Sequence, residues 1–147
     1  MHASTASAIL SAVQDTLATQ GLSDVTVVGH SLGAALALLD GVFLGLHLPQ
    51  NVTTKVIAYG MPRVGNQAFA DFVDGQLSGR VTHVNNQQDP VPVVPGGFLG
   101  FHHPSGEVHI LNSGAWNACP GAFFLNSFLA CVFAVWFAPS DVLRKLA

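Results

Sequence analysis

Residues 25–33 read Val-Thr-Val-Val-Gly-His-Ser-Leu-Gly, and this stretch decides the fold. It begins as a short β-branched run, and residues 24–28 are predicted to form a strand buried on both faces of a parallel sheet. An Ala- and Leu-rich run follows over residues 32–46 and predicts a helix. The stretch therefore indicates a strand, a sharp turn and a helix, with Ser31 at the turn.

The segments on either side repeat this alternation of strand and helix. Apolar residues at helical spacing predict a helix over 5–19 that stops at Gly21. Downstream, the pattern predicts a strand at 53–59, a helix at 67–74 and a strand at 80–85. Such alternation is typical of an α/β domain with a mostly parallel sheet, flanking helices and right-handed crossovers.

The sequence changes character after Asp89. Four of the eight prolines follow it closely, which indicates a loop, and a hairpin is predicted between 101–103 and 108–111 around the turn at 104–106. The seventeen residues 122–138 carry no charge, slightly fewer than the about 20 that a membrane span needs. We therefore divide the chain into a core at 1–121 and an apolar C-terminal tail at 122–147.

Composition excludes several classes of function. Of the 147 residues, 50% are hydrophobic and only 9% are charged, which excludes intrinsic disorder for most of the chain. The net charge is −3 and the five cations are scattered, so we expect no nucleic-acid partner. Cys119 and Cys131 lie in no CxxC pair or His/Cys cluster, so no structural zinc site is predicted, and whether they are bridged stays open.

The pentapeptide Gly29-His30-Ser31-Leu32-Gly33 carries the chemistry. It is a G-x-S-x-G nucleophile elbow placed between a predicted strand and a predicted helix, where this motif needs to be. The turn holds the serine in a strained conformation, and we expect both flanking glycines to admit the close-packed backbone. Ser31 is then the nucleophile, and the backbone N–H of Leu32 receives the oxyanion of the tetrahedral intermediate.

A nucleophilic serine needs a base, and the base needs an acid to orient it. In α/β-hydrolases the chain order is Ser, then Asp or Glu, then His. Asp89 fits the second place because it follows a predicted strand, although a solvated turn aspartate is an equally good interpretation of the residue alone. His102, His103 and His109 are the histidines after Asp89, and for each we favour a structural or surface role over that of a base.

Four motifs occur in order: GHSLG within 25–33, YGMPRVGN at 59–66, NQQDPVP at 86–92 and FHHPSGEVHI at 101–110. In these stretches the chain resembles the fungal class 3 lipases, a family of triacylglycerol lipases. The resemblance implies an α/β-hydrolase fold, Ser31 as nucleophile, Asp89 as the acid of the triad, and lipid carboxylic esters as substrates. It also implies an acyl-enzyme mechanism without metal or organic cofactor, and secretion of the intact protein.

The chain departs from the family pattern at both ends. The family's catalytic His lies downstream of the predicted hairpin, yet no His follows His109, so the third member of the triad is unassigned. Only 30 residues precede Ser31, whereas the family has early strands, a lid and a second oxyanion donor there. We therefore expect a partial α/β-hydrolase core, truncated at both ends, whose sheet exposes an edge.

These departures leave three hypotheses about function. The first is a lipase-type serine hydrolase, with activity far below that of the family because loss of the His costs about 10⁶ in turnover in one serine hydrolase. The second is a lipid- or membrane-associated binding module anchored by 122–138, and the third is an esterase for short soluble acyl esters. For the tail we rank non-native sequence from a misread exon boundary ahead of a membrane anchor or a core helix. The N-terminus carries no secretory signal, and the oligomeric state stays open.

Overall fold

The computed structural model describes residues 2–119, which form a five-stranded sheet with helices packed on it. The strand order is β1-β2-β4-β6-β7, in which the first four strands are parallel and β7 is antiparallel to β6. A small second sheet pairs β3 with β5. The elements are α1 (His2–Gln20), β1 (Asp24–His30), α2 (Leu32–His47), β2 (Thr53–Tyr59), β3 (Gly65–Asn66), α3 (Gln67–Gln76), β4 (Val81–Asn86), β5 (Phe101–His102), β6 (Glu107–Ile110) and β7 (Trp116–Ala118), with short 3₁₀ turns η1 (Val91–Val93) and η2 (Gly97–Leu99).

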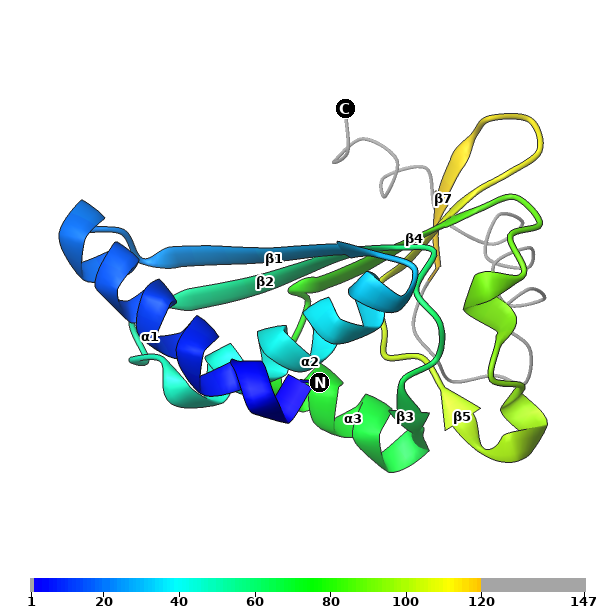
Figure 1. The fold of residues 1–147 in the computed structure, drawn as a ribbon. Helices are drawn as coiled ribbons and strands as arrows, with labels where there is room; N and C mark the ends of the chain where they lie inside the picture. The colour runs from blue at the N-terminus through cyan, green and yellow to red at the C-terminus, as the bar shows by residue number, and fades with distance from the viewer. Residues whose placement is uncertain (1, 120–147) are drawn as a thin grey trace.

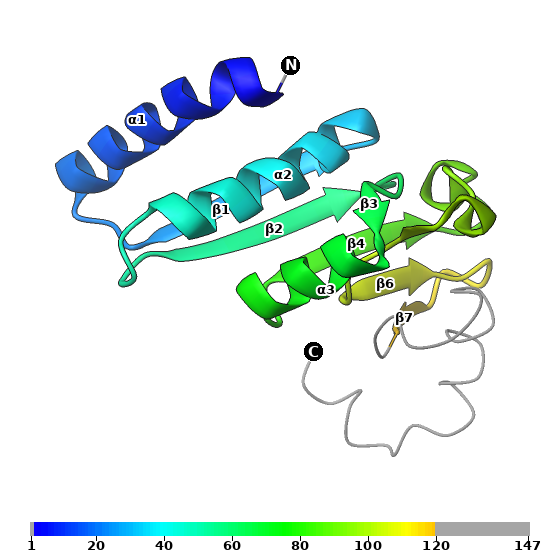
Figure 2. The same cartoon turned by 90° about the horizontal axis from the view of Figure 1, so that it is seen from below.

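The helices lie on one face of the sheet, as Figures 1 and 2 show. Helix α2 packs so closely on β2 that a β-carbon at Gly41 would lie 2.2 Å from Val56 Cγ2. Because the helices cover this face, the buried core lies between them and the strands. It consists of Ala34, Leu38, Val42, Val56, Ala58, Met61, Val73, Leu77 and Val81.

The predicted α/β fold class with a mostly parallel sheet is confirmed, and the structure corrects two details. The predicted strand at 24–28 extends to His30, and it is not buried on both faces. Its residues alternate between exposed and half-buried, with Val28 exposed. The reason is that, in the part of the chain that the structure describes, β1 is an edge strand that pairs with β2 alone and is covered by helices on one face.

The predicted hairpin between 101–103 and 108–111 is wrong. Strand β5 pairs with β3, whereas β6 pairs in parallel with β4 and in antiparallel with β7. Contacts from distant residues turn the chain here: the Asp74 carboxylate accepts hydrogen bonds from both the backbone N–H and the hydroxyl of Ser105, at 2.9 and 2.8 Å. The backbone N–H of His83 then donates to the carbonyl oxygen of Gly106 at 3.0 Å, which sets β6 beside β4.

The tail interpretations fall on residues 122–138, outside the described residues, and so does Cys131. Within residues 2–119, no helix is both long and apolar enough to cross a membrane.

Candidate active site

Ser31 occupies a strained turn between β1 and α2. Its backbone lies at φ 55° and ψ −127°, and a positive φ is uncommon for a residue with a side chain. The Ser31 N–H donates to the carbonyl oxygen of Tyr59 at 2.9 Å, which fixes the turn to the end of the neighbouring strand. Strain of this kind is typical of functional sites whose surroundings hold the backbone in place.

The two glycines of the elbow play different parts. A β-carbon at Gly29 would lie 2.2 Å from the carbonyl oxygen of Gly33 and 2.7 Å from the nitrogen of Ala34, so only glycine fits there. A β-carbon at Gly33 would meet nothing within 4 Å. The expectation that close backbone packing demands both glycines therefore holds for Gly29 and is wrong for Gly33.

Leu32 is the first residue of α2, directly after the serine. The first N–H groups of a helix have no partner within it, and the helix dipole places partial positive charge at this end. The Ser31 side chain makes no capping hydrogen bond to these groups. An oxygen bearing negative charge beside Ser31 would therefore meet unpaired N–H donors.

Asp89 follows β4 and lies at the carboxyl edge of the sheet, where β1 also delivers Ser31 (Figure 1). Its Oδ1 accepts a hydrogen bond from Val91 N–H at 2.9 Å. A β-carbon built on Gly60 would lie 2.9 Å from Asp89 Oδ2 and 3.9 Å from His30 Nε2. The carboxylate therefore fits closely against Gly60, which has a φ of +55°, and this part of Gly60 was not foreseen from the sequence.

His103 is buried and bonded to the backbone. Its Nε2 is 2.9 Å from the carbonyl oxygen of Pro92, and its ring stacks on His83 with centroids 4.9 Å apart. Burial lowers the pKa of His103, and it lowers the pKa of His83 to about 3. Both rings are therefore neutral at pH 7, and His103 Nε2 carries the proton that it donates to Pro92.

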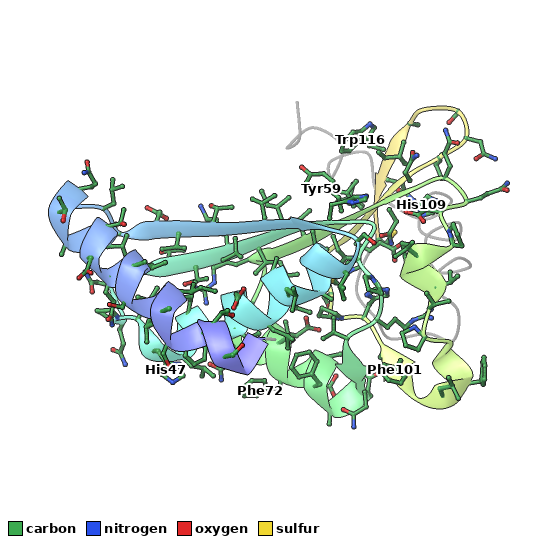
Figure 3. All side chains as sticks on the ribbon, in the orientation of Figure 1. His47, Tyr59, Phe72, Phe101, His109 and Trp116 are labelled. Carbon is green, nitrogen blue, oxygen red and sulfur yellow. The ribbon has the colours of Figure 1, made fainter. Side chains whose placement is uncertain are left out.

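The other histidines lie in different places. His109 lies on β6, labelled in Figure 3, with its Nδ1 3.5 Å from the Glu107 carboxylate. His102 belongs to β5 and pairs with Gly65 of β3. His30 ends β1, opposite Tyr59 in the sheet register, and is the nearest histidine to Ser31 in the sequence. No contact in the described residues joins any of them to the Ser31 hydroxyl, so the base stays unassigned.

Arg63 and His103 together hold four consecutive carbonyl groups of the segment after Asp89. The Arg63 guanidinium donates to the carbonyl oxygens of Val93 and Pro95, and the Arg63 backbone N–H donates to that of Val94 at 2.9 Å. His103 binds the carbonyl group of Pro92. This clamp joins the motifs at 59–66 and 101–110 to the segment that carries the aspartate, and sequence reasoning missed it.

A pocket of about 310 Å³ opens beside Asp89, and its walls include Arg63, Asn85, His103 and Glu107. Asn85 donates to Glu107 Oε1 at 2.9 Å, and partial burial lowers the pKa of Arg63 while Glu107 opposes that effect. Asp89 is part of the lining and Ser31 is not, so the pocket adjoins the aspartate and not the nucleophile. Across residues 2–119, no three His, Cys, Asp or Glu side chains gather closely enough to hold a metal ion.

Comparison with known sequences identifies a family. A family model described as lipase (class 3) matches residues 1–98. A secreted mono- and diacylglycerol lipase of Malassezia globosa is 46% identical over 101 residues, which cover 67% of this chain and 33% of the relative. A secreted mono- and diacylglycerol lipase of Gibberella zeae is 40% identical over 117 residues, covering 77% of this chain and 36% of the relative. The chain thus spans about a third of the length of these relatives.

Solved structures show the same relationship. Lipase II from Rhizopus niveus superposes with a TM-score of 0.72 at 29% identity, over 91% of this chain and 51% of that chain. A Rhizomucor miehei lipase gives a TM-score of 0.71 at 28% identity, over 78% of this chain and 37% of that chain. Both neighbours are lipases with the α/β-hydrolase fold, in agreement with the fold class predicted from the sequence.

Proposed function

The chain belongs to the class 3 lipase family, and on that premise we propose that its chemistry is serine ester hydrolysis on lipid esters such as mono- and diacylglycerols. The proposal rests chiefly on the strained Ser31 at the start of α2. The position of Asp89 at the same edge of the sheet supports it. The names of the relatives, as lipases of mono- and diacylglycerols, supply the substrate class.

Ser31, Leu32 and Asp89 each have a definite part in the proposed reaction. Ser31 Oγ attacks the ester carbonyl carbon, its proton passes to a base, and the carbonyl oxygen becomes an oxyanion beside the N–H of Leu32. The tetrahedral intermediate collapses, the C–O bond to the alcohol breaks, and the alcohol leaves with the proton. Water then attacks the acyl-Ser31 ester and releases the fatty acid. Asp89 orients the base and stabilises its protonated form.

The base is the unassigned member of this mechanism. His103 is an unsuitable candidate because its Nε2 is committed to Pro92 and its burial lowers its pKa. His30 ends the strand that leads into Ser31 and comes close to the point where Gly60 faces Asp89, yet it makes no bond to either residue among the described atoms. We therefore assign nucleophile, oxyanion donor and acid to Ser31, Leu32 and Asp89, and no described histidine to the base.

The same relationship suggests the protein's surroundings. Relatives are named as secreted lipases, so we propose that the intact protein is exported and meets its substrate outside the cell. Its partner there is a lipid ester. We propose that the reaction uses no metal or organic cofactor and that the protein binds no nucleic acid.

Acyl adducts test the nucleophile and the substrate class together. The full chain is incubated with p-nitrophenyl butyrate or p-nitrophenyl decanoate, and the adduct is located by peptide mass spectrometry. We expect acylation at Ser31, absent from Ser31→Ala, and faster with the decanoyl ester because a lipase favours long acyl chains. An adduct only with the butyryl ester supports instead the esterase for short soluble substrates. Acylation that persists in Ser31→Ala contradicts the proposal.

A further inference from the structure

Gly60 lies directly after β2, between the strand that leads to the nucleophile and the strand that leads to the acid. Strand β2 pairs with β1 on one side and with β4 on the other. Because the three strands are parallel, their carboxyl ends meet at one edge of the sheet, as Figure 1 shows. Residues at the end of β2 are therefore placed to contact the surroundings of both Ser31 and Asp89.

One peptide group binds both neighbouring segments. The carbonyl oxygen of Tyr59 accepts a hydrogen bond from the Ser31 N–H at 2.9 Å, and the Gly60 N–H donates to the carbonyl oxygen of Val84 at 2.9 Å. This carbonyl group and this N–H belong to the same peptide bond, which is planar and rigid. It therefore fixes the spacing between the turn at Ser31 and β4, the strand that leads to Asp89.

The Asp89 carboxylate lies beside the space that a side chain at position 60 would occupy. A β-carbon there would be 2.9 Å from Asp89 Oδ2. The other carboxylate oxygen, Oδ1, accepts a hydrogen bond from the Val91 N–H at 2.9 Å. The carboxylate is thus held by a hydrogen bond on one side and bounded by the bare Cα of Gly60 on the other.

From these contacts we propose that Gly60 is a positioning residue for the acid of the proposed reaction. Its missing side chain leaves the space for the Asp89 carboxylate, and the peptide group before it sets how that carboxylate lies relative to Ser31. The inference rests on the proposed function, because it gives Asp89 the role of acid. Gly60 acts through Asp89 and is not itself a catalytic residue.

The backbone gives a second reason for glycine at this position, since its φ is +55°. That reason alone predicts that alanine strains the backbone and does nothing to Asp89. The contact predicts more: ordinary contact with a β-carbon begins at 3.4 Å, so the carboxylate has to move by about 0.5 Å. Because the obstructing atom ends a side chain and is not part of the backbone, Gly60→Ala should fold with its carboxylate displaced.

Gly21 supplies the matched control. Its φ is +64°, and a β-carbon there would meet nothing within 4 Å. Gly21→Ala therefore carries the backbone strain of a left-handed residue without any contact to Asp89. The difference between Gly60→Ala and Gly21→Ala measures the effect on the carboxylate alone.

The first experiment measures how fast a fluorophosphonate modifies Ser31 in the full chain, with and without imidazole as a soluble base. A misplacement of 1 Å costs about 10²-fold, so Gly60→Ala should lower the acceleration by imidazole about tenfold. Gly21→Ala should match the parent, and in an Asp89→Asn background Gly60→Ala should have no further effect. A general loss of folded protein would lower both rates and leave their ratio unchanged.

Amide hydrogen exchange at Val91 tests the same contact without any reaction. The Val91 N–H is bonded to Asp89 Oδ1, so a displaced carboxylate should accelerate its exchange in Gly60→Ala and not in Gly21→Ala. Asp89→Ala removes this bond, so Gly60→Ala should add no further acceleration in that background.

Equal behaviour of Gly60→Ala and Gly21→Ala in both measurements would overturn the inference and leave backbone strain as the reason for the glycine. Faster exchange at Val91 with an unchanged acceleration by imidazole would overturn it too, because the displaced carboxylate would then not act on the base. A parent chain that is not modified at Ser31 contradicts the proposed function instead. Exchange at Val91 then decides alone: equal exchange in the two variants overturns the placing of Asp89 by Gly60, and faster exchange in Gly60→Ala supports it.

Discussion

The nucleophile elbow at 29–33 and the aspartate segment at 86–95 carry the two proposed catalytic side chains, yet they are held in different ways. The elbow depends chiefly on a local contact, Gly29 against the backbone of Gly33, and one hydrogen bond from Ser31 N–H to the carbonyl oxygen of Tyr59 anchors it to β2. The aspartate segment depends on Arg63, 32 residues before the Pro95 carbonyl group that it binds, and on His103, 11 residues after Pro92. One proposed catalytic position is therefore held mainly by a local contact, whereas the segment that carries the other is held largely by more distant residues.

The largest expected effect tests the local side of this comparison. Gly29→Ala places a methyl group against backbone atoms that cannot move aside, so we expect a loss of about 3 kcal/mol in unfolding free energy. Gly33→Ala is the matched control, and because its β-carbon meets no atom it should leave stability unchanged or raise it by up to about 1 kcal/mol. Urea denaturation of both variants measures the difference, and equal losses would refute the local account of the elbow.

The contacts between Arg63 and the aspartate segment can be tested by removing the Arg63 side chain. Arg63→Ala removes the guanidinium bonds to two loop carbonyl groups, so stability should fall by about 2 kcal/mol. Amide hydrogen exchange at Val93 and Val94 should accelerate, while exchange in the elbow stays slow. Arg80→Ala, which removes one bond to the carbonyl group of Gln76, is the control. If both variants speed exchange in the aspartate segment equally, Arg63 is not its clamp.

The stacked pair His83 and His103 under the same segment predicts a pH dependence. The folded pKa of His83 is about 3 and the ordinary value is 6.5, so between these values the unfolded state binds a proton that the folded state does not. Stability is then complete above pH 6.5 and falls with decreasing pH, by up to about 1.4 kcal/mol per pH unit for each buried histidine. In His83→Gln, urea denaturation from pH 7 to pH 4 should show a shallower fall. An unchanged slope would mean that His83 does not titrate in this way.

The smallest expected effect lies at Phe98, in the η2 turn of the segment that follows Asp89. Phe98 is almost fully exposed, so Phe98→Ser should change unfolding free energy by less than about 0.5 kcal/mol. Such a small effect would sharpen the comparison, because it would mean that the bonds from Arg63, and not the exposed side chains, hold residues 93–99 in place. Thermal unfolding measures the effect, and a loss similar to that of Arg63→Ala would show that Phe98 packs against the fold.

The fold class, the strand at 53–59 and the elbow could be predicted because their signals are local: β-branched runs, helical spacing and a glycine-flanked serine. The hairpin at 101–111 was mispredicted because its turn residues are bound by Asp74 and its strands pair with β3 and β4. The roles of Gly60 and Arg63 were missed for the same reason, since the atoms that they contact come from a segment about thirty residues away. The places of Ser31, Leu32 and Asp89 in the reaction stay predictions.

The central claim is that Ser31 is a nucleophile in an ester-hydrolase site without a described base. Its most direct test is the rate at which a fluorophosphonate modifies Ser31 in the full chain, with and without added imidazole as a soluble base. The account predicts slow modification at Ser31, accelerated by imidazole and absent from Ser31→Ala. Modification at other residues, or none even with imidazole, would contradict it. Rapid modification without imidazole would show that the chain supplies its own base, against the expectation from the sequence.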